Sequence, residues 1–419
     1  MQKKSAVRFP KRFLWGAATS AHQVEGGNHN QWSVWELDHA KQLADKAEES
    51  FGHQENWNDI KKQAIHPTNY VSDKAASHYK LYELDFDILQ KLNMNAYRFS
   101  IEWSRVEPRE GVWDVTAIQH YRDCLRALKE RGIEPIVTLF HFTLPVWFEN
   151  MNGFERRGNI RYFVRFARMI EEELGANIKL IITINEPEVY VNESYREGRW
   201  PPCEKNSYRT WRVISNLVTA HRRVADVFHK ANPRYQISIA KHIVHFEPGD
   251  DSWLSRLSTK AIRYVQNDYL VDRVIDSCDY LGVNYYMSSR VYGYRIHGLN
   301  VEKNDMGWDM RPSDIQHVIE RMFTKYKKPI IITENGLADA DDAKRNWWLA
   351  ETLAAMGRAV ASGAKLDGYL HWSLLDNFEW DKGFWPRFGL VAVDRKTAKR
   401  SVRKSALSYA KFVKTQRGR

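Results

Sequence analysis

Two stretches decide the fold, LIITINEP at residues 180–187 and PIIITENG at residues 329–336. In each, a run of β-branched and aliphatic residues leads directly to a glutamate, Glu186 in the first and Glu334 in the second. A short, continuously apolar run is typical of a strand buried on both faces, which is the usual situation in a parallel sheet. Both stretches are therefore predicted to be buried parallel strands, each with a glutamate at its carboxyl end.

The same kind of run recurs along the chain, and helix-like stretches separate the runs. Apolar residues in those stretches recur at three- and four-residue spacing, most clearly at residues 78–92, 118–131 and 347–362. Strands that alternate with helices predict a parallel sheet. Eight such units in 419 residues predict an α/β fold, a single (β/α)8 barrel with long inserted loops. The predicted strands cover residues 13–20, 95–103, 134–142, 180–187, 236–244, 280–286, 329–336 and 366–374.

Length and composition agree with one large folded unit. At about 150 residues per domain, a chain of 419 residues would suggest two or three domains, but α/β barrels are longer single domains. Hydrophobic residues make up 43% of the chain, which is enough for a folded core. We therefore expect one domain over residues 1–419, with the polar segment 36–72 inserted as a loop on the catalytic face and a second long excursion at 200–235.

The composition argues against several kinds of site. The three cysteines are far apart and form no CxxC pair, so neither a disulfide framework nor a cysteine-rich zinc site is expected. His39, His53 and His66 match no ligand spacing, so we expect no metal, and no other cofactor is called for. The N-terminal stretch lacks the apolar core of a signal peptide and no run approaches a membrane span, which predicts a cytoplasmic protein.

The net charge of +11 makes nucleic acid or an anionic membrane surface a candidate partner. The basic residues are spread along the chain, however, and the densest group, at residues 395–419, has the pattern of a solvated face of a terminal helix. We therefore expect no nucleic-acid partner.

Polar and aromatic side chains occupy the carboxyl ends of all eight predicted strands. Because the carboxyl ends of barrel strands point to the active-site face, these side chains are expected to converge on one polar pocket. They are Gln23, Glu25, Arg98, Ser100, His141, Asn185, Glu186, Lys241, His242, Asn284, Tyr286, Glu334 and Trp372.

Glu186 and Glu334 are the two strand-end residues that suggest a reaction. For one buried glutamate of this kind, an ion pair with a core cation is a sufficient explanation. Two of them, after the fourth and seventh predicted strands, lie on opposite sides of the barrel. A facing carboxyl pair suits glycoside hydrolysis, in which one carboxyl protonates the leaving oxygen and the other attacks or activates water.

With these residues identified, the chain resembles the glycoside hydrolase family 1 β-glycosidases over nearly its full length. The longest matching segment is WSLLDNFEWDKGFWPRFGL at residues 372–390, which is too long for a chance match. The other segments are FLWGAATSAHQVEGG, NAYRFSIEWSRVEP, VTLFHFTLPVW, TINEP, LGVNYY and IITENG.

The resemblance implies roles that can be assigned residue by residue. Glu334 matches the nucleophile and Glu186 the acid/base, while Asn185 matches the residue that binds the sugar 2-hydroxyl. The residues implied to support the nucleophile are Arg98, Tyr286 and Asn284. The residues implied to hold the glycone are Gln23, His141, Glu379 and Trp380, with Trp372 as an aromatic floor and Phe388 as a wall. Two tryptophans lie in segments that flank the leaving-group side, Trp200 and Trp308.

These roles set expectations for pKa values and geometry. Arg98 and Tyr286 are expected to give Glu334 a low pKa, and the charge of Glu334 is expected to raise the pKa of Glu186. A retaining mechanism, which forms a covalent glycosyl intermediate, expects the two carboxyls to lie about 5–5.5 Å apart. A separation of about 8 Å would instead indicate inversion.

Several positions bear on specificity. Glu379 and Trp380 favour unphosphorylated glycosides, because a carboxylate at that place would repel a sugar phosphate. The presence of Glu186 argues against the thioglucosidase relatives, which lack this carboxyl. Glu188 directly follows NEP, where the family usually has Trp, and is expected near the leaving group. A short link after Asn267 and the segment 36–72 are expected to affect substrate length.

The leading hypothesis is a retaining exo-β-glycosidase acting on small β-glycosides or oligosaccharides. It would release terminal, non-reducing β-D-glucosyl residues, with β-galactosyl and β-fucosyl residues as further glycones. One alternative is a transglycosidase with the same covalent intermediate. Another is a non-catalytic sugar-binding protein on the same fold, against which the presence of both glutamates speaks. A binder of polyanions or membrane surfaces rests on the charge alone, and salt-dependent binding would distinguish it.

Overall fold

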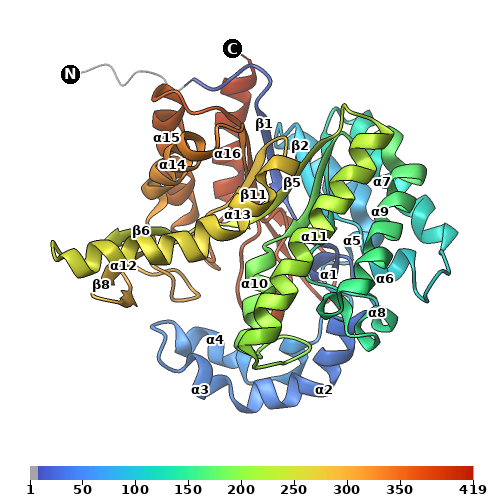
Figure 1. The fold of residues 1–419 in the computed structure, drawn as a ribbon, viewed down its shortest axis with the longest axis horizontal. Helices are drawn as coiled ribbons and strands as arrows, with labels where there is room; N and C mark the ends of the chain where they lie inside the picture. The colour runs from blue at the N-terminus through green and yellow to red at the C-terminus, as the bar shows by residue number, and fades with distance from the viewer. Residues whose placement is uncertain (1–7, 419) are drawn as a thin grey trace.

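The barrel predicted from the sequence is present. The computed structural model describes residues 8–418, so the basic start of the chain, residues 1–7, and Arg419 lie outside the described residues. Eight parallel strands close into a barrel in the order β1, β11, β10, β7, β5, β4, β3, β2, and helices surround it (Figure 1). The barrel strands are β1 (Leu14–Ala18), β2 (Ala96–Ser100), β3 (Glu134–Phe140), β4 (Leu180–Asn185), β5 (Gln236–His242), β7 (Leu281–Asn284), β10 (Ile330–Asn335) and β11 (Leu366–Trp372).

Each predicted strand contains one barrel strand, and the differences lie at the ends. The second predicted strand extends to Trp103, but β2 ends at Ser100 and helix α6 (Trp103–Val106) begins three residues later. Likewise Tyr286 lies two residues beyond the end of β7. The polar residues therefore sit at the point where each strand leaves the sheet, and this places them on the active-site face of the barrel.

The segment 200–235 is not the loop excursion expected from the sequence. Most of it forms α11 (Ser207–Ala231), a helix of 25 residues that packs against the barrel strand β4 and the neighbouring helix α9 (Ile160–Leu174). Its apolar residues Val213, Leu217 and Val224 are fully buried at helical spacing, while its outer face is charged. Charged residues of the outer face alternate in the sequence with apolar residues of the inner face, so the helical spacing of the apolar residues was not recognised.

The segment 36–72 is also helical and not a loop. With the residues just before it, the segment forms α2 (Gln31–Asp45), α3 (Ala47–Phe51) and α4 (Trp57–Ala64), followed by a 3-10 turn, Pro67–Tyr70. In Figure 1 these helices lie together at one end of the barrel. Trp57 and Ile60 pack on Trp385, so the insertion is fixed to the loop that follows β11.

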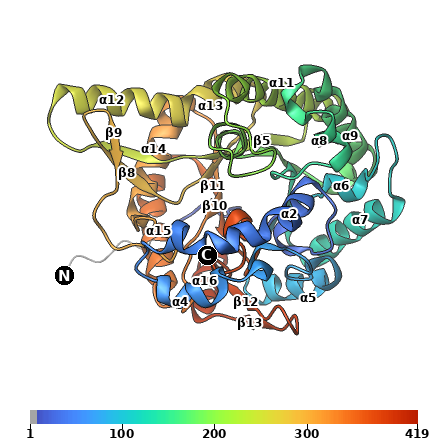
Figure 2. The same ribbon diagram turned by 90° about the horizontal axis from the view of Figure 1, so that it is seen from below.

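The remaining helices complete the wall of the barrel, apart from one group that projects from it. That group consists of α12 (Trp253–Arg263) and a small sheet of β6 (His245–Pro248), β8 (Ser288–Tyr292) and β9 (Arg295–His297) (Figure 2). A short sheet of β12 (Val391–Val393) and β13 (Arg400–Val402) precedes the last helix. The other helices are α1 (Ala21–Val24), α5 (His78–Lys91), α7 (Val115–Glu130), α8 (Val146–Asn150), α10 (Pro187–Val191), α13 (Tyr269–Val274), α14 (Ile315–Tyr326), α15 (Arg345–Ala361) and α16 (Lys404–Arg417).

The C-terminal basic run is largely a solvated helix face, as predicted. On α16 the lysines Lys411 and Lys414 are exposed, while Tyr409 and Val413 are buried against the barrel. Within residues 8–418, no helix is long and apolar enough to cross a membrane. The same residues contain no group of three or more His, Cys, Asp or Glu side chains that could hold a metal ion.

Candidate active site

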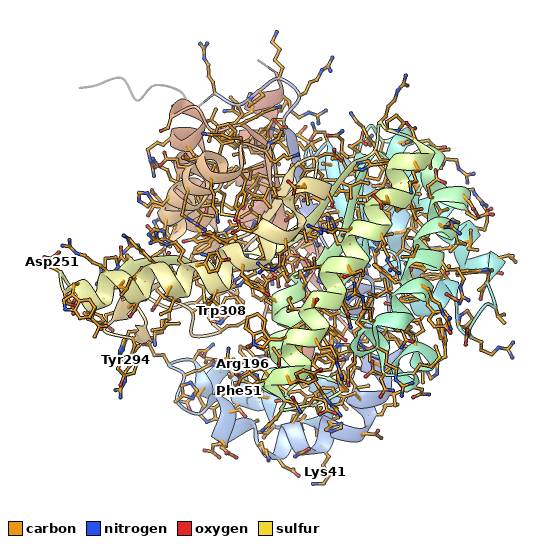
Figure 3. The ribbon with its side chains drawn as sticks, viewed as in Figure 1. Lys41, Phe51, Arg196, Asp251, Tyr294 and Trp308 are labelled. Atoms are coloured by element: carbon orange, nitrogen blue, oxygen red, sulfur yellow. The ribbon has the colours of Figure 1, made fainter. Side chains whose placement is uncertain are left out.

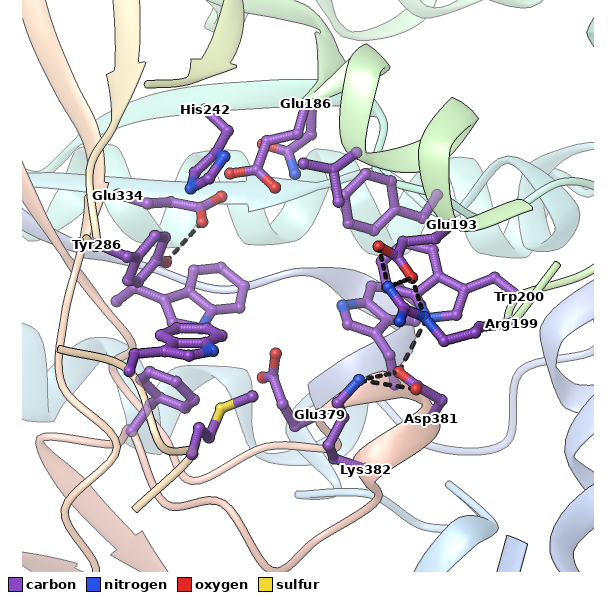
Figure 4. A pocket seen from close by; sticks show the side chains of 18 of the residues that line it. Glu186, Glu193, Arg199, Trp200, His242, Tyr286, Glu334, Glu379, Asp381 and Lys382 are labelled. Atoms are coloured by element: carbon purple, nitrogen blue, oxygen red, sulfur yellow. Dashed lines mark hydrogen bonds and ion pairs between the residues drawn. The ribbon is translucent and has the colours of Figure 1, made fainter. Parts of the chain in front are cut away.

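The two strand-end glutamates line one cavity of about 330 Å³. Glu334 is the fifth of the six residues of β10, and the pairing of that strand with β7 shifts register between Ile332 and Glu334. Glu186 follows the last residue of β4 and adopts a left-handed conformation with φ 38°. Its N–H donates to the carbonyl of Ala240 on β5 at 2.8 Å, which holds this unusual turn in place. Figure 4 shows both carboxyl groups directed into the cavity.

Two donors from other strands hold the carboxyl group of Glu334. Arg98 Nη1 lies 2.6 Å from Oε1, and the Tyr286 hydroxyl donates to Oε2 at 2.8 Å. Arg98 is itself fixed, because it donates to Asn185 Oδ1 at 2.7 Å and to Thr138 Oγ1 at 3.0 Å. The carboxylate is therefore held in one orientation by a buried cation and a phenol.

Glu186 has a neutral partner instead. Asn284 Nδ2 donates to Glu186 Oε1 at 2.7 Å, and Thr333 Oγ1 donates to the Asn284 amide oxygen at 2.6 Å, which fixes the orientation of that amide. Asn284, expected to support Glu334 only, thus also contacts Glu186, and its amide lowers the pKa of both carboxyls.

The expected low pKa of Glu334 is wrong. Burial raises the pKa of Glu334 above its ordinary value, and this effect outweighs the opposing influence of Arg98 and Tyr286. Burial together with the negative charge of Glu334 raises the pKa of Glu186 much further, as expected for that residue. The order is therefore preserved: Glu334 loses its proton first and Glu186 remains the acid.

Glu379 stands across the cavity from this pair (Figure 4), and Gln23, which does not itself line the cavity, contacts its carboxyl group. Gln23 is fully buried and donates to the carbonyl of Phe378 at 2.8 Å and to Glu379 Oε2 at 3.4 Å. Burial raises the pKa of Glu379 to about 8, with Lys382 opposing it. At neutral pH this carboxyl is mostly protonated, so the charge repulsion of phosphate expected from the sequence is reduced.

Aromatic rings form most of the remaining wall. The His141 ring lies between Trp372 and Trp380, with centroids 5.7 and 6.1 Å away and nearly parallel planes. His141 Nε2 faces the Asn185 amide at 3.1 Å, while its Nδ1 is buried without a partner and can bind a ligand hydroxyl. Phe388 closes the side next to Tyr286.

The cavity also has a charged rim that the sequence did not reveal. Arg199 pairs with Glu193 at 2.6 Å, and Lys382 pairs with Asp381 at 2.7 Å. Asp381 and Lys382 directly follow Trp380, so their position in the motif could have indicated them, whereas nothing in the sequence marked the Arg199 pair. The other lining residues that the sequence did not predict are Phe51, Gln54, Phe142, Val189, Met306 and Trp385.

The two expected leaving-group tryptophans both line the cavity. Trp200 is buried and donates from Nε1 to Asp381 Oδ1 at 2.9 Å, so it belongs to the rim. Trp308 packs on Tyr286 and Phe388, with ring centroids 5.7 and 6.2 Å away.

Glu188 does not line this cavity, contrary to the expectation that it lies beside the leaving group. It lines a neighbouring cavity of about 360 Å³, where its Oε1 pairs with buried Lys241 at 2.6 Å and accepts from the His242 N–H at 3.0 Å. The first turn of α10 directs it there, away from Glu186. The two cavities share Val189, Glu193 and His242 as a common wall.

Six of the thirteen predicted strand-end residues do not line the cavity. Gln23, Arg98 and Asn284 contact carboxyls that line it, and Lys241 lines the neighbouring cavity. The other two, Glu25 and Ser100, have partners elsewhere. Glu25 pairs with Arg105 at 2.8 Å and accepts from the Tyr121 hydroxyl, and Ser100 accepts from the N–H of Ala21. The sequence predicts that all the strand-end residues meet in one pocket, and in the structure only some of them do.

A closed (β/α)8 barrel with two buried carboxyls and aromatic walls in one cavity is the arrangement expected of a glycoside hydrolase. The family model of glycosyl hydrolase family 1 matches residues 5–282 and 261–418, so the chain belongs to this family. It is 29% identical to "Beta-glucosidase A" of Thermotoga maritima, over 97% of this chain and 98% of that protein. It is 31% identical to a benzoxazinone glucoside β-D-glucosidase of Triticum aestivum, over 96% of this chain and 82% of that protein.

Solved structures agree with this assignment. The "beta-glycosidase from Pyrococcus horikoshii" superposes with a TM-score of 0.87 at 33% identity, covering 98% of this chain and 96% of that one. The "Beta-glucosidase from Thermotoga maritima in complex with glucoimidazole" superposes with a TM-score of 0.86 at 28% identity, covering 98% and 100%.

Proposed function

We propose that the chain is a retaining exo-β-glucosidase, with Glu334 as nucleophile and Glu186 as acid/base. The observation that carries the proposal is the difference between the partners of the two carboxyls. Glu334 is held by a cation and a phenol, Arg98 and Tyr286, whereas Glu186 is contacted by the neutral amide of Asn284. Relatives with β-glucosidase names support the glycone.

In the first step Glu334, ionised, attacks the anomeric carbon while Glu186 transfers its proton to the leaving oxygen. The attack forms an ester between Glu334 and the sugar, and the negative charge of Glu334 is lost. Because that charge is one of the groups that raise the pKa of Glu186, the pKa of Glu186 then falls. Glu186 can now accept a proton from water as the water oxygen bonds to the anomeric carbon. The bond between that carbon and Glu334 breaks, which releases the sugar and restores the Glu334 carboxylate.

The glycone pocket is built to hold one terminal sugar. Trp372 offers a ring face for the apolar side of the sugar, while His141, Asn185 and Glu379 offer polar atoms to its hydroxyls. Unphosphorylated sugars remain the proposed substrates, because the nearby cations are already neutralised: Lys382 by Asp381 and Arg199 by Glu193.

A panel of chromogenic β-glycosides tests the proposal with wild type, Glu334→Gln and Glu186→Gln. Wild type is expected to cleave β-glucosides fastest, with β-galactosides and β-fucosides slower and 6-phosphoglucosides not cleaved. Glu334→Gln should lose at least about 10³-fold in kcat, because it removes the attacking oxygen. Glu186→Gln should retain more activity on substrates whose leaving groups need no protonation.

Product analysis decides among the remaining readings. Retention is shown if the first product formed is the β-anomer, and an α-anomer as first product would refute it. An added alcohol that captures most of the glycosyl groups would favour the transglycosidase. A wild type that binds glucosides and cleaves none of them would make the chain a sugar-binding protein.

A further inference from the structure

An arm projects from the barrel on the side of β5 and β7, made of α12 and the β8–β9 hairpin (Figures 1 and 2). The arm is unusually apolar for a surface. Of the nineteen large apolar side chains that are strongly exposed among the described residues, eight lie on the arm or on the π-helix Tyr264–Asp268 that follows α12. They are Trp253, Leu254, Leu257, Tyr264, Val265, Tyr292, Tyr294 and Ile296.

The outward face of α12 combines an apolar stripe with basic residues. Trp253, Leu257 and Ala261 are exposed at four-residue spacing, so they form one line along the helix, and Trp253 has 74% of its surface exposed. Arg256 and Lys260 are exposed immediately beside this line. From Ser252 to Asn267 the chain contains no Asp or Glu.

The hairpin presents the same chemistry at the tip of the arm. The N–H of Gly293 in the hairpin turn donates to Ser255 Oγ at 2.7 Å, which holds the turn against the first turns of α12. Next to this contact Tyr294, with 71% of its surface exposed, lies far out on the arm in Figure 3. Arg295 and Ile296 are exposed beside it. One end of the molecule therefore carries aromatic, aliphatic and basic side chains together, with the exposed carboxylates of Asp250 and Asp251 just before α12.

The basic groups on the arm are only partly neutralised. Arg256 pairs with Asp251 at 2.7 Å, and Arg290 pairs with Glu247 at 2.7 Å. Lys260 and Arg295 form no ion pair with an acidic side chain in residues 8–418. The arm therefore keeps positive charge next to its exposed rings.

We propose that this arm docks on an anionic lipid surface. Tryptophan and tyrosine rings with an aliphatic stripe fit the boundary between headgroups and acyl chains, while Lys and Arg reach the lipid phosphates. A second copy fits less well, because a symmetric pair of arms would bring Lys260 and Arg295 of both copies close together. The arm thereby accounts for part of the net charge of +11.

Vesicle co-sedimentation with the full chain tests the proposal. Vesicles of phosphatidylcholine alone are compared with vesicles that also contain phosphatidylglycerol, at low and high salt. Wild type is expected to bind the anionic vesicles, and less so as salt rises. A triple variant, Trp253→Ser, Leu257→Ser and Tyr294→Ser, should bind about tenfold or more weakly, since it removes the apolar contacts.

Two further variants separate the contributions. Lys260→Glu with Arg295→Glu should abolish the preference for anionic over neutral vesicles. Trp347→Ser, which removes an exposed tryptophan from α15 and leaves the arm unchanged, should bind as wild type does. All variants should cleave a water-soluble chromogenic glucoside at the wild-type rate, which shows that they are folded.

Three results would overturn the proposal. The first is that wild type binds neither kind of vesicle. The second is that the triple variant binds as well as wild type. The third is that wild type is a dimer by light scattering and the triple variant a monomer, because the arm would then be an interface between copies.

Discussion

The hydroxyl of Tyr286 provides a sharp test of how the nucleophile is kept reactive. It donates to Glu334 Oε2 at 2.8 Å, and burial together with the nearby carboxylates raises the pKa of Tyr286 far enough to keep its proton in place. Tyr286→Phe removes this one bond and leaves the ring that packs on Trp308 and Phe388. The substitution therefore changes the shape of the side chain little and removes one hydrogen bond to the carboxylate.

The sign and size of the effect follow from the hydrogen bond. A hydrogen bond to a charged group contributes about 1.5–3 kcal/mol, so its loss should lower kcat/KM by about 10- to 100-fold. Because the hydroxyl stabilises only the ionised carboxyl, its loss raises the pKa of Glu334. The acid limb of the pH profile should move to higher pH, and the loss of rate should be larger at low pH.

The assay is the pH dependence of kcat/KM for a chromogenic β-glucoside, with Tyr285→Phe as matched control. Tyr285 is the preceding residue, and its hydroxyl donates to the carbonyl of Arg311 at 2.6 Å, away from the cavity. The control should lower the thermal stability and leave the acid limb unmoved. An acid limb that stays in place in Tyr286→Phe, or one that moves to lower pH, would refute the reasoning.

Three further predictions concern the surroundings of the pair. Lys241→Met should lower the free energy of unfolding by about 1–3 kcal/mol, because the partly exposed carboxylate of Glu188 loses its cation partner. Adding Glu188→Gln should recover part of that loss in thermal unfolding, and equal stability of all three proteins would contradict this. Glu379→Gln should change KM little at about pH 6 and more at about pH 9, because the pKa of Glu379 is about 8; a KM effect independent of pH would contradict this. Trp308→Ala should raise KM for aryl glucosides more than the inhibition constant of free glucose; equal changes would place Trp308 on the glycone.

The barrel could be predicted because each of its strands is a short apolar run on a chain of alternating units. The helices of the insertion at residues 36–72 could not be predicted in the same way. α4 buries only Trp57, Ile60 and Ala64, and the partner of its apolar face is Trp385, more than three hundred residues later in the chain. A helix with so small a buried face looks like a polar loop until its partner is known.

In the site, the sequence predicts the residues at the carboxyl ends of the strands. It does not predict side chains whose direction depends on packing between distant parts of the chain. Glu188 was placed by proximity to Glu186 in the chain, but one turn of α10 directs it into another cavity. The sequence does not predict the Arg199–Glu193 pair, because Glu193 lies in a π-helix, Asn192–Arg196, whose period differs from that of an α-helix, and Arg199 lies just after it. Side-chain direction at such places is set by tertiary contacts and not by local pattern.

The sequence predicts a low pKa for Glu334, whereas burial raises it, and the reason bears on the mechanism. The sequence identifies the groups that lower a pKa, Arg98 and Tyr286, because they belong to motifs. Burial is a property of the whole barrel, and it raises the pKa of Glu186, Glu334 and Glu379. The reaction requires the pKa of Glu186 to lie above that of Glu334. It does not require the pKa of Glu334 to be low. Burial raises the pKa of both carboxyls, so the difference between their pKa values has two other causes. Arg98 and Tyr286 lower the pKa of Glu334, and the charge of Glu334 raises the pKa of Glu186. Since that charge disappears in the glycosyl ester, the same arrangement that makes Glu186 an acid in the first step makes it a base in the second.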